Sequence, residues 1–421
     1  MTSLGTSVFY NCSSLTTVDI PNGVTSIDEK AFYGCKLLAS VDIPNSVTTI
    51  GNEAFSGCYK LASLTIGNGV TSIGNKAFEN CNSLSSLTLN FKDISTWFKG
   101  RISIKEITIG DDVETISSSA FSGCSGLTSV TIGNSVTTIG SSAFSGCSAL
   151  ASITIGESVT DVGKYAFKDC NSLTSATLLC KEIGTWLAYP SLQEVIFGDK
   201  VETIGDYAFY GCSGLTSLTI GKGVTSIGKN AFYECTSLTV LDIPSSVTTI
   251  DEWAFYGCSG LTSATIGTKN ICYCAFANCT NMTSLTFGNS VESIGNQAFY
   301  GCYQITSITS IAVTPPTCGE STFDSWIFNT CILKVPTASI DLYKSADQWK
   351  EFKKIEALPA VFGDANGDGN VTITDAVAVV DFILGNNPEG FNVEAADVNN
   401  DGNVNITDAV GIVDIILNSG E

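Results

Sequence analysis

The sequence predicts a solenoid of stacked coils with a parallel β-sheet along one face, followed by a small all-α domain. Three observations lead to this fold class. Cysteines recur every 23 residues over much of the chain, apolar residues alternate with Ser or Thr at fixed distances after them, and residues 363–421 contain one acidic phrase twice. A fixed period of roughly 20 to 50 residues is typical of solenoids, in which each coil buries its apolar edge against its neighbours.

The cysteine positions define the coils. Twelve cysteines occupy one equivalent position: Cys12, Cys35, Cys58, Cys81, Cys124, Cys147, Cys170, Cys212, Cys235, Cys258, Cys279 and Cys302. Three, six and eight residues after them the chain is apolar, while positions five and seven are mostly Ser, Thr or Asp. This alternation predicts a short half-buried strand. Gly or Pro then turns the chain, and a second apolar set completes the coil, as in Val24, Ile27, Ala31 and Phe32.

The cysteine count is interrupted twice, over residues 82–123 and 171–211. Each interval is long enough for one additional, degenerate coil. We therefore predict roughly 14 coils, whose strands join in parallel as the coils stack.

The repeated cysteines are interpreted as small buried thiols in a column, because pairing every member as disulfides would strain the solenoid. Cys318 and Cys331 lie outside this column, and for them a disulfide and two free thiols remain alternatives. Cys272 and Cys274 are interpreted as core substitutions in a shortened coil. Neither a second cysteine pair nor any His accompanies them to complete a metal site.

Two surfaces of the coils remain open to interpretation. The Ser and Thr residues of the strands form either a ladder that keeps a long sheet soluble or a weakly charged docking surface for a protein or glycan. These positions include Ser63, Thr65, Ser86, Thr88, Ser129, Thr131, Ser152, Thr154, Ser217 and Thr219. Recurring tyrosines at the coil corner form either half-buried packing or a second patch. They are Tyr33, Tyr210, Tyr233, Tyr256 and Tyr300.

Residues 312–358 depart from the repeat and are predicted to form a cap that closes the open end of the core. Within them, residues 337–355 are expected to form a helix that turns Trp349, Phe352 and Ile355 inward. Residues 357–362 are expected to serve as a short linker.

The repeated acidic phrase has the spacing of a calcium loop, which needs oxygen ligands at positions 1, 3, 5, 7, 9 and 12 and Gly at position 6. The first copy supplies Asp364, Asn366, Asp368, the carbonyl of Asn370, Thr372 and Asp375; the second supplies Asp397, Asn399, Asp401, the carbonyl of Asn403, Asn405 and Asp408. Each loop leads into an apolar segment, 376–384 or 409–417, predicted to be a helix. We expect two calcium ions and a domain that folds only with them; the alternative is an acidic disordered tail.

The composition excludes several functions. The 421 residues carry a net charge of −21, and residues 363–421 hold 11 Asp and Glu but no Lys or Arg, so no nucleic-acid partner is expected. The chain has no His, which removes His-based triads and most transition-metal sites. No apolar run approaches the roughly 18 residues of a membrane span, so membrane insertion is not expected.

The repeat unit resembles a known family. The pattern C-x-x-L-x-x-[VIL]-x-I-[PG]-x-[GS]-V-x-x-I-x-x-x-A-F-x-x, as in residues 212–234, is similar to the 23-residue leucine-rich repeats of BspA-like surface and secreted proteins. The resemblance covers about residues 1–311. It implies a leucine-rich repeat solenoid with a parallel sheet on one face and mostly turns and short helical segments on the other. It also implies binding or adhesion to a macromolecule.

Residues 361–421 resemble the type I dockerin family, because position 12 of each loop is Asp and no helix precedes either loop. The resemblance implies a paired F-hand domain that binds a cohesin module of a scaffold protein through its helix faces. Carried over by position, the contact candidates are Ile373, Thr374, Val380 and Asp381 in the first copy and Ile406, Thr407, Val413 and Asp414 in the second. The near identity of the copies allows two binding modes related by a two-fold rotation.

These features predict a non-catalytic, secreted or surface-displayed binding protein with a solenoid (1–311), a cap (312–358) and a dockerin-like domain (359–421). The start inside a repeat suggests that an export signal lies outside this chain. One alternative is a rigid spacer whose calcium-stabilised end has no cohesin partner. An enzyme is the other alternative, supported only by scattered carboxylates.

Overall fold

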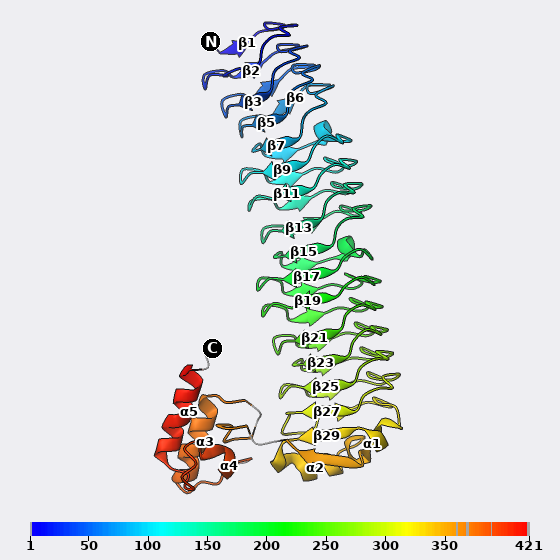
Figure 1. Cartoon of the computed structure of the whole chain (residues 1–421), viewed down its shortest axis with the longest axis vertical. Coiled ribbons are helices and arrows are strands. Elements are labelled where there is room, and N and C mark those ends of the chain that lie inside the picture. The colour runs from blue at the N-terminus through cyan, green and yellow to red at the C-terminus, as the bar shows by residue number, and fades with distance from the viewer. Residues whose placement is uncertain (1, 359–360, 368–369, 389, 419–421) are drawn as a thin grey trace. The chain divides into compact units, whose positions relative to one another are not determined.

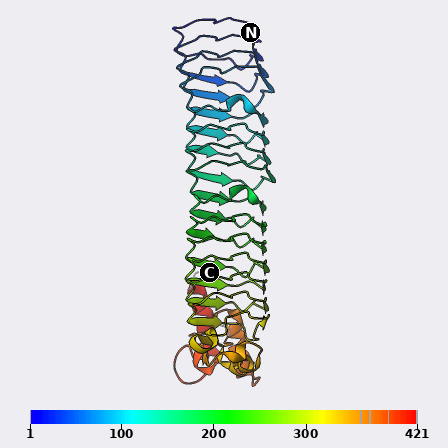
Figure 2. The ribbon, with the colours of Figure 1, turned by 90° about the vertical axis from the view of Figure 1, so that its right-hand side faces the viewer.

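The computed structural model describes residues 2–358, 361–367, 370–388 and 390–418. The chain divides into two compact units, Met1–Gly223 and Val224–Glu421. Coils of the repeat build the first unit and begin the second, which ends in helices (Figure 1). Within each unit the strands of successive coils run in the same direction, as Figure 2 shows.

The main strands of the first unit form two parallel sheets, ordered β11-β9-β7-β5-β3 and β13-β15-β17-β19. Their bounds are β3 (Ser40–Ile43), β5 (Ser63–Ile66), β7 (Ser86–Leu89), β9 (Glu106–Ile109), β11 (Ser129–Thr131), β13 (Ser152–Ile155), β15 (Ser175–Leu178), β17 (Glu194–Phe197) and β19 (Ser217–Thr219). The register keeps equivalent residues level, with Ser63 opposite Ser86 and Leu64 opposite Leu87. Leu64 and Leu87 are buried, so the predicted alternation of the strands is confirmed.

A second set of two-residue parallel strands, which was not predicted from the sequence, runs along the turns of the first unit and is divided between separate sheets. Its members are β1 (Ser3–Leu4), β2 (Ser26–Ile27), β4 (Thr49–Ile50), β6 (Ser72–Ile73), β8 (Asp93–Ile94), β10 (Thr115–Ile116), β12 (Thr138–Ile139), β14 (Asp161–Val162), β16 (Glu182–Ile183) and β18 (Thr203–Ile204). The degenerate coils are confirmed, because β9 and β17 fall inside the two long cysteine intervals. Each of these coils contains a 3-10 turn, η1 (Thr96–Phe98) or η2 (Thr185–Leu187).

The second unit repeats the same plan. Its main sheet is ordered β21-β23-β25-β27-β29-β30, with bounds β21 (Val240–Ile243), β23 (Ser263–Ile266), β25 (Ser284–Phe287), β27 (Ser307–Ser310), β29 (Ile332–Val335) and β30 (Lys354–Ala357). The short ladder contains β20 (Ser226–Ile227), β22 (Thr249–Ile250), β24 (Asn270–Ile271), β26 (Ser293–Ile294) and β28 (Thr317–Cys318). The leucine-rich repeat solenoid predicted from the sequence is therefore the fold.

A stack of phenylalanines fills the coil interior. Phe32 and Phe55 lie 5.0 Å apart between ring centroids with their planes 7° from parallel, and Phe255 and Phe276 repeat this geometry in the second unit. All four rings are fully buried. The centroid separation is close to the spacing of roughly 4.8 Å between paired strands, so one ring per coil fits the backbone ladder without adjustment.

The residue before each repeated Cys takes a left-handed conformation, which explains why Gly is frequent there. Gly57 and Gly123 both have φ of 77°, and Gly146 has φ of 76°. A residue without Cβ adopts this conformation at no steric cost, so Gly allows the turn that brings Cys into the core.

The predicted column of buried thiols is confirmed for eleven of its twelve members, whereas Cys12 is exposed, and the buried thiols are hydrogen-bonded between coils. Cys58 Sγ donates to the Phe32 carbonyl oxygen of the preceding coil at 3.3 Å, and the same oxygen accepts the Cys35 backbone N–H at 3.2 Å. This pattern recurs in both units, for example from Cys258 Sγ to the Phe232 carbonyl at 3.2 Å. Each thiol thus supplies a second donor to a buried carbonyl that would otherwise keep one lone pair unused.

All 17 cysteines are free thiols. Of the two alternatives for Cys318 and Cys331, the structure has the free thiols, and Cys331 is buried. Cys274 is buried with its Sγ 3.6 Å from Gln297 Oε1, as expected for a core substitution, whereas Cys272 is half-exposed.

The single helix predicted over residues 337–355 is wrong. This segment forms η3 (Thr337–Ser339), α2 (Ile340–Ser345), η4 (Trp349–Glu351) and the first residues of β30, and it follows α1 (Ile327–Thr330). The helix ends because Ala346 is extended and Gln348 has a left-handed φ of 64°. Pairing with β29 then draws Ile355 into a strand opposite Leu333.

Two residues predicted to turn inward in this segment do so. Trp349 and Phe352 are buried, and Trp349 Nε1 donates to the Pro316 carbonyl oxygen at 2.7 Å. Ile355 is half-buried. These side chains pack at the last coils of the repeat, as a cap requires.

We predict that Phe144→Ala costs about 3 to 5 kcal/mol of unfolding free energy, because it removes a fully buried ring stacked between Phe121 and Phe167. Urea unfolding followed by circular dichroism measures the loss. The matched control is Tyr59→Ala, an aromatic truncation at a side chain that is 45% exposed, and it should change stability by less than about 0.5 kcal/mol. Equal losses in both variants would contradict the stacked core.

Thiol accessibility provides a second test. In the native protein at pH 8, Ellman's reagent should react with exposed Cys12 and, more slowly, with half-exposed Cys272 and Cys318, and it should reach all 17 thiols only in denaturant. Burial removes access and also raises the pKa of Cys124 to about 11 and of Cys170 to about 12, so little reactive thiolate exists at pH 8. Rapid native reaction of most thiols would show that the column is not closed.

Candidate functional site

The helical region contains the two predicted calcium loops, each leading into a helix. The first loop precedes α3 (Ile373–Ile383) and the second precedes α5 (Ile406–Asn418), with the short α4 (Val393–Ala396) between them. Both helices begin three residues earlier than predicted, because the Asp at loop position 12 lies within the first helical turn and accepts the backbone N–H of loop position 9, just before the helix. The prediction that no helix precedes either loop is wrong for the second loop, because the four-residue α4 ends directly before Asp397.

The position-12 aspartates hold the two loops in the same way. Asp375 accepts the backbone N–H of Asn366 at 3.0 Å on one carboxylate oxygen and that of Thr372 at 2.7 Å on the other. Asp408 likewise accepts the N–H of Asn399 at 3.3 Å and that of Asn405 at 2.9 Å. Both carboxylates are fully buried. Each one therefore ties loop positions 3 and 9 to the start of its helix.

The second loop curls around its own carboxylates. Asp397 accepts the backbone N–H of Asp401 at 3.1 Å and of Gly402 at 2.8 Å, and Asp401 accepts that of Asn403 at 2.8 Å. Gly402 has φ of 84°, the left-handed conformation expected at position 6. In the first loop, Asp368 and Gly369 lie outside the described residues, and Asp364 is buried.

The donor chemistry fits a hard cation. Every predicted ligand offers oxygen, three carboxylates are buried, and residues 361–418 contain no Lys or Arg to compensate them. The described residues do not, however, gather three Asp, Glu, His or Cys side chains into a group able to hold a metal ion. In the second loop, backbone hydrogen bonds to Asp397, Asp401 and Asp408 fold the chain around these oxygen donors.

The core of the helical region lies between α3 and α5. Ala376 and Val379 pack against Ala409 and Ile412, and all four are buried. Phe382 stacks on Phe391 with ring centroids 4.4 Å apart, which holds the connecting segment to α3. These contacts leave the opposite sides of both helices free of internal packing.

Five of the eight predicted partner-contact residues, all except Val380, Asp381 and Val413, are exposed away from the core, and Val413 packs against the core. Ile373 and Ile406 are 60% and 59% exposed, and their neighbours Thr374 and Thr407 are exposed as well. Val380 and Asp414 are exposed, whereas Asp381 and Val413 are half-buried.

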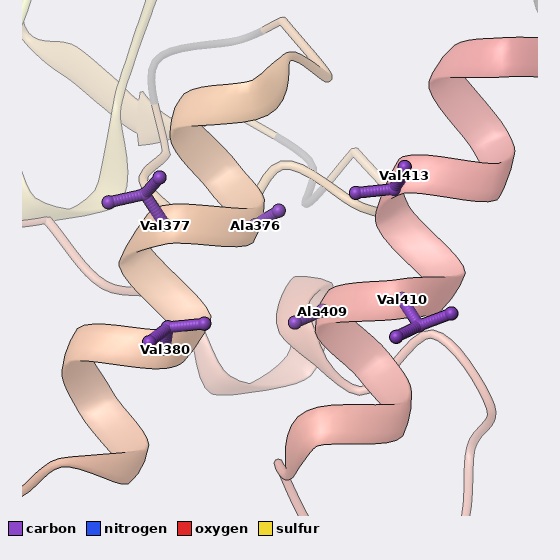
Figure 3. Close-up of a pocket in the computed structure, with 6 residues that line it drawn as sticks. All are labelled: Ala376, Val377, Val380, Ala409, Val410 and Val413. Carbon is purple, nitrogen blue, oxygen red and sulfur yellow. The ribbon is translucent and has the colours of Figure 1, made fainter.

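Sequence reasoning missed other apolar residues on the same sides. Val377 and Val410 are 54% and 56% exposed, and Leu384 and Leu417 are exposed too. An apolar groove of about 340 Å³ lies between the helices, lined by Ala376, Val377, Val380, Ala409, Val410 and Val413 (Figure 3). In the sequence, the groove is indicated only by the identical spacing of apolar residues in the two copies. That spacing alone does not show which of these positions are buried and which are exposed.

The solenoid surfaces considered from the sequence are both present. The strand face carries Ser and Thr in register, such as Thr65 opposite Thr88. At the coil corner, Tyr233 stacks on Tyr256 with centroids 5.0 Å apart, and Tyr256 Oη accepts the Asn278 side-chain amide at 2.6 Å. Stacking covers part of these rings, so the corner presents mainly ring edges and hydroxyls.

Comparison with known families gives two matches. The BspA type leucine-rich repeat region matches in six copies over residues 2–96, 94–187, 184–306 and 266–341. The chain belongs to the BspA-type leucine-rich repeat proteins. The dockerin type I domain matches residues 362–416, which contain α3, α4 and most of α5. Both are binding modules without known catalysis.

Solved structures of bacterial leucine-rich repeat proteins are similar to this chain. One from Bacteroides ovatus is 31% identical, with 73% of this chain and 76% of that chain covered and a TM-score of 0.45. A leucine-rich cell surface protein from Faecalibacterium prausnitzii is 28% identical, with 65% and 88% covered and a TM-score of 0.33. No curated protein matches. Among the described residues, none of the helices has both the length and the apolar character needed to cross a membrane.

Proposed function

We propose that the chain is a non-catalytic, secreted or surface-displayed binding protein of three parts, the solenoid (1–311), its cap (312–358) and a dockerin domain (359–421). The solenoid contacts a protein or glycan target, and the dockerin domain attaches it to a cohesin module of a scaffold protein. The observation that supports attachment most directly is the pair of equivalent helices with exposed apolar faces, α3 and α5, within a dockerin match.

Two calcium ions would support this domain. Asp364, Asn366, Asp368, Thr372 and Asp375 with the carbonyl of Asn370 would hold the first; Asp397, Asn399, Asp401, Asn405 and Asp408 with the carbonyl of Asn403 would hold the second. Calcium supplies positive charge that the domain's side chains lack. The clustered carboxylates repel one another, and calcium would offset this repulsion, so we expect folding of the domain to be coupled to the ion.

We expect chelation of calcium to unfold the helices of the dockerin domain. In hydrogen exchange with mass spectrometry on the full chain, amides of α3 and α5 should lose at least about tenfold of their protection in EGTA, while solenoid peptides stay unchanged. Asp408→Asn should reproduce the loss for the second loop in calcium. Glu394→Gln, an equivalent change at an exposed residue of α4, should not. Full protection in EGTA would contradict calcium-coupled folding.

Attachment is tested with purified cohesin modules of several types on the immobilised full chain, in calcium and again in EGTA. We expect at least one module to bind in calcium and to dissociate in EGTA. The alternative function is a rigid spacer with a calcium-stabilised end. A domain that folds and binds calcium but retains no cohesin would favour the spacer.

A further inference from the structure

Three outward positions of each coil meet at its corner. They lie six, five and two residues before the repeated Cys, and the Ala and Phe between them are buried. A tight turn joins them, because the backbone N–H of Tyr256 donates to the Trp253 carbonyl oxygen at 3.1 Å. In the second unit, four successive coils place twelve residues at these positions, and five of the twelve are aromatic: Tyr233, Trp253, Tyr256, Tyr273 and Tyr300. We call these five residues the aromatic corner.

Packing of the coil does not require aromatic residues at these positions. Two coils of the first unit carry Ser at all three, within the segments 118–122 and 141–145. Phe121 and Phe144, which lie between these serines, are fully buried, as Phe255 is in a coil of the aromatic corner. The repeats therefore supply an internal comparison. Since the core is closed with either kind of side chain, core packing does not account for the aromatic corner.

Contacts between neighbouring coils hold the rings in place. The Trp253 and Tyr273 rings meet edge to face with centroids 5.4 Å apart, and Tyr273 Oη donates to Gln297 Oε1 at 3.2 Å. Lys229 Nζ lies 4.5 Å from the Trp253 ring centroid and also pairs with a carboxylate oxygen of Glu252 at 2.7 Å. Side chains that are already held in one position lose little conformational entropy when a ligand binds to them.

The aromatic corner presents both ring surface and polar groups to solvent. Tyr300 is 45% exposed and contacts no other ring within the described part of the chain, since the equivalent residue of the preceding coil is Ala277. Tyr273 is 39% exposed. Next to the rings lie side-chain amides, such as Asn278, which donates to Tyr256 Oη at 2.6 Å. Exposed rings therefore lie beside hydroxyl and amide groups that form hydrogen bonds.

This combination indicates a carbohydrate ligand. The C–H faces of a sugar ring pack on aromatic rings, and its hydroxyl groups exchange hydrogen bonds with phenol and amide groups. The coil spacing of roughly 4.8 Å is close to the length of one hexose unit, so a polysaccharide along the corner meets an equivalent position at each unit. A protein interface is built around a contiguous apolar centre, whereas Ala277 is the only aliphatic residue among the twelve.

Charge restricts the class of polysaccharide. The chain carries a net charge of −21, and Lys229, the one basic residue among the twelve, is already paired with Glu252. An acidic polysaccharide would therefore be repelled by the chain and would find no free cation at the corner. A neutral polysaccharide avoids this cost.

We propose that the aromatic corner binds a neutral polysaccharide that lies along successive coils, with Trp253, Tyr273 and Tyr300 in contact with its sugar rings. The proposal rests on the proposed target binding by the solenoid, and it names the ligand class and the surface. It assigns binding to the coil corner and not to the Ser and Thr residues of the strand face.

The test uses the full chain in calcium and three soluble neutral polysaccharides, a mixed-linkage β-glucan, a galactomannan and an arabinoxylan, with polygalacturonate as an acidic one. Native affinity gels and titration calorimetry measure binding. At least one neutral polysaccharide should bind, and polygalacturonate should not. Trp253→Ser, Tyr273→Ser and Tyr300→Ser should each weaken binding about three- to tenfold.

The matched control is Tyr59→Ser, because Tyr59 is also 45% exposed but lies outside the three corner positions. It should leave binding unchanged. Ser occupies the equivalent corner positions in other coils, so the three corner variants should keep the melting temperature of the unmodified chain. Binding that falls only together with the melting temperature would show a structural role and would overturn the proposal.

Other results would overturn it as well: binding of none of the neutral polysaccharides, or equal weakening by Tyr59→Ser. Polysaccharide binding that all three corner variants retain would keep a glycan target of the solenoid but remove the aromatic corner. A protein target that requires the same three residues, with no polysaccharide bound, would keep target binding and remove the carbohydrate. Cohesin binding is a separate readout, and it should be equal in all variants because the corner takes no part in attachment.

Discussion

Backbone pairing between successive coils is the constraint on which the solenoid depends. Parallel strands stack at roughly 4.8 Å, so a side chain in one coil faces the equivalent side chain of the next. A residue type that recurs at one position of the repeat must therefore pack against the same residue type in the next coil. Phenylalanine does so face to face, as Phe32 on Phe55, and Thr does so by hydrogen bonding, as Thr48 Oγ1 to the Thr25 carbonyl at 3.0 Å. The repeat period in the sequence is a consequence of this vertical register.

The thiol column obeys the same constraint with a different chemistry. A Cys at each coil is small enough to fill the interior and donates its S–H to the preceding coil's Phe carbonyl, as Cys147 does to Phe121 at 3.3 Å. A disulfide between neighbouring coils would remove two of these donors and pull the coils out of their common spacing. Free thiols therefore keep both the hydrogen bonds between coils and the equal spacing of the coils, which disulfides would disturb.

The helical domain follows a different rule, because its two copies pack against each other instead of stacking in a series. Some buried pairs differ between the copies, as Val379 and Ile412 do, whereas Ala376 and Ala409 are both buried and identical. The exposed pairs Ile373/Ile406 and Val377/Val410 are identical as well. The acidic loops, held by buried Asp375 and Asp408, set where each helix begins.

The sequence by itself determined the solenoid, its strands, the buried thiols and the pair of acidic loops, because all of these depend on local spacing repeated many times. Only the tertiary structure decided the features that depend on distant partners. Pairing with β29 placed residues 354–355, the end of the predicted helix, and Ala357, the start of the predicted linker, in one strand. The structure also decided that Cys318 and Cys331 are free thiols. The second set of short strands and the exposed groove at Val377 and Val410 could not be predicted from the sequence, because they too depend on contacts between distant residues. Spacing shows which residues share a side, but only packing shows whether that side is covered.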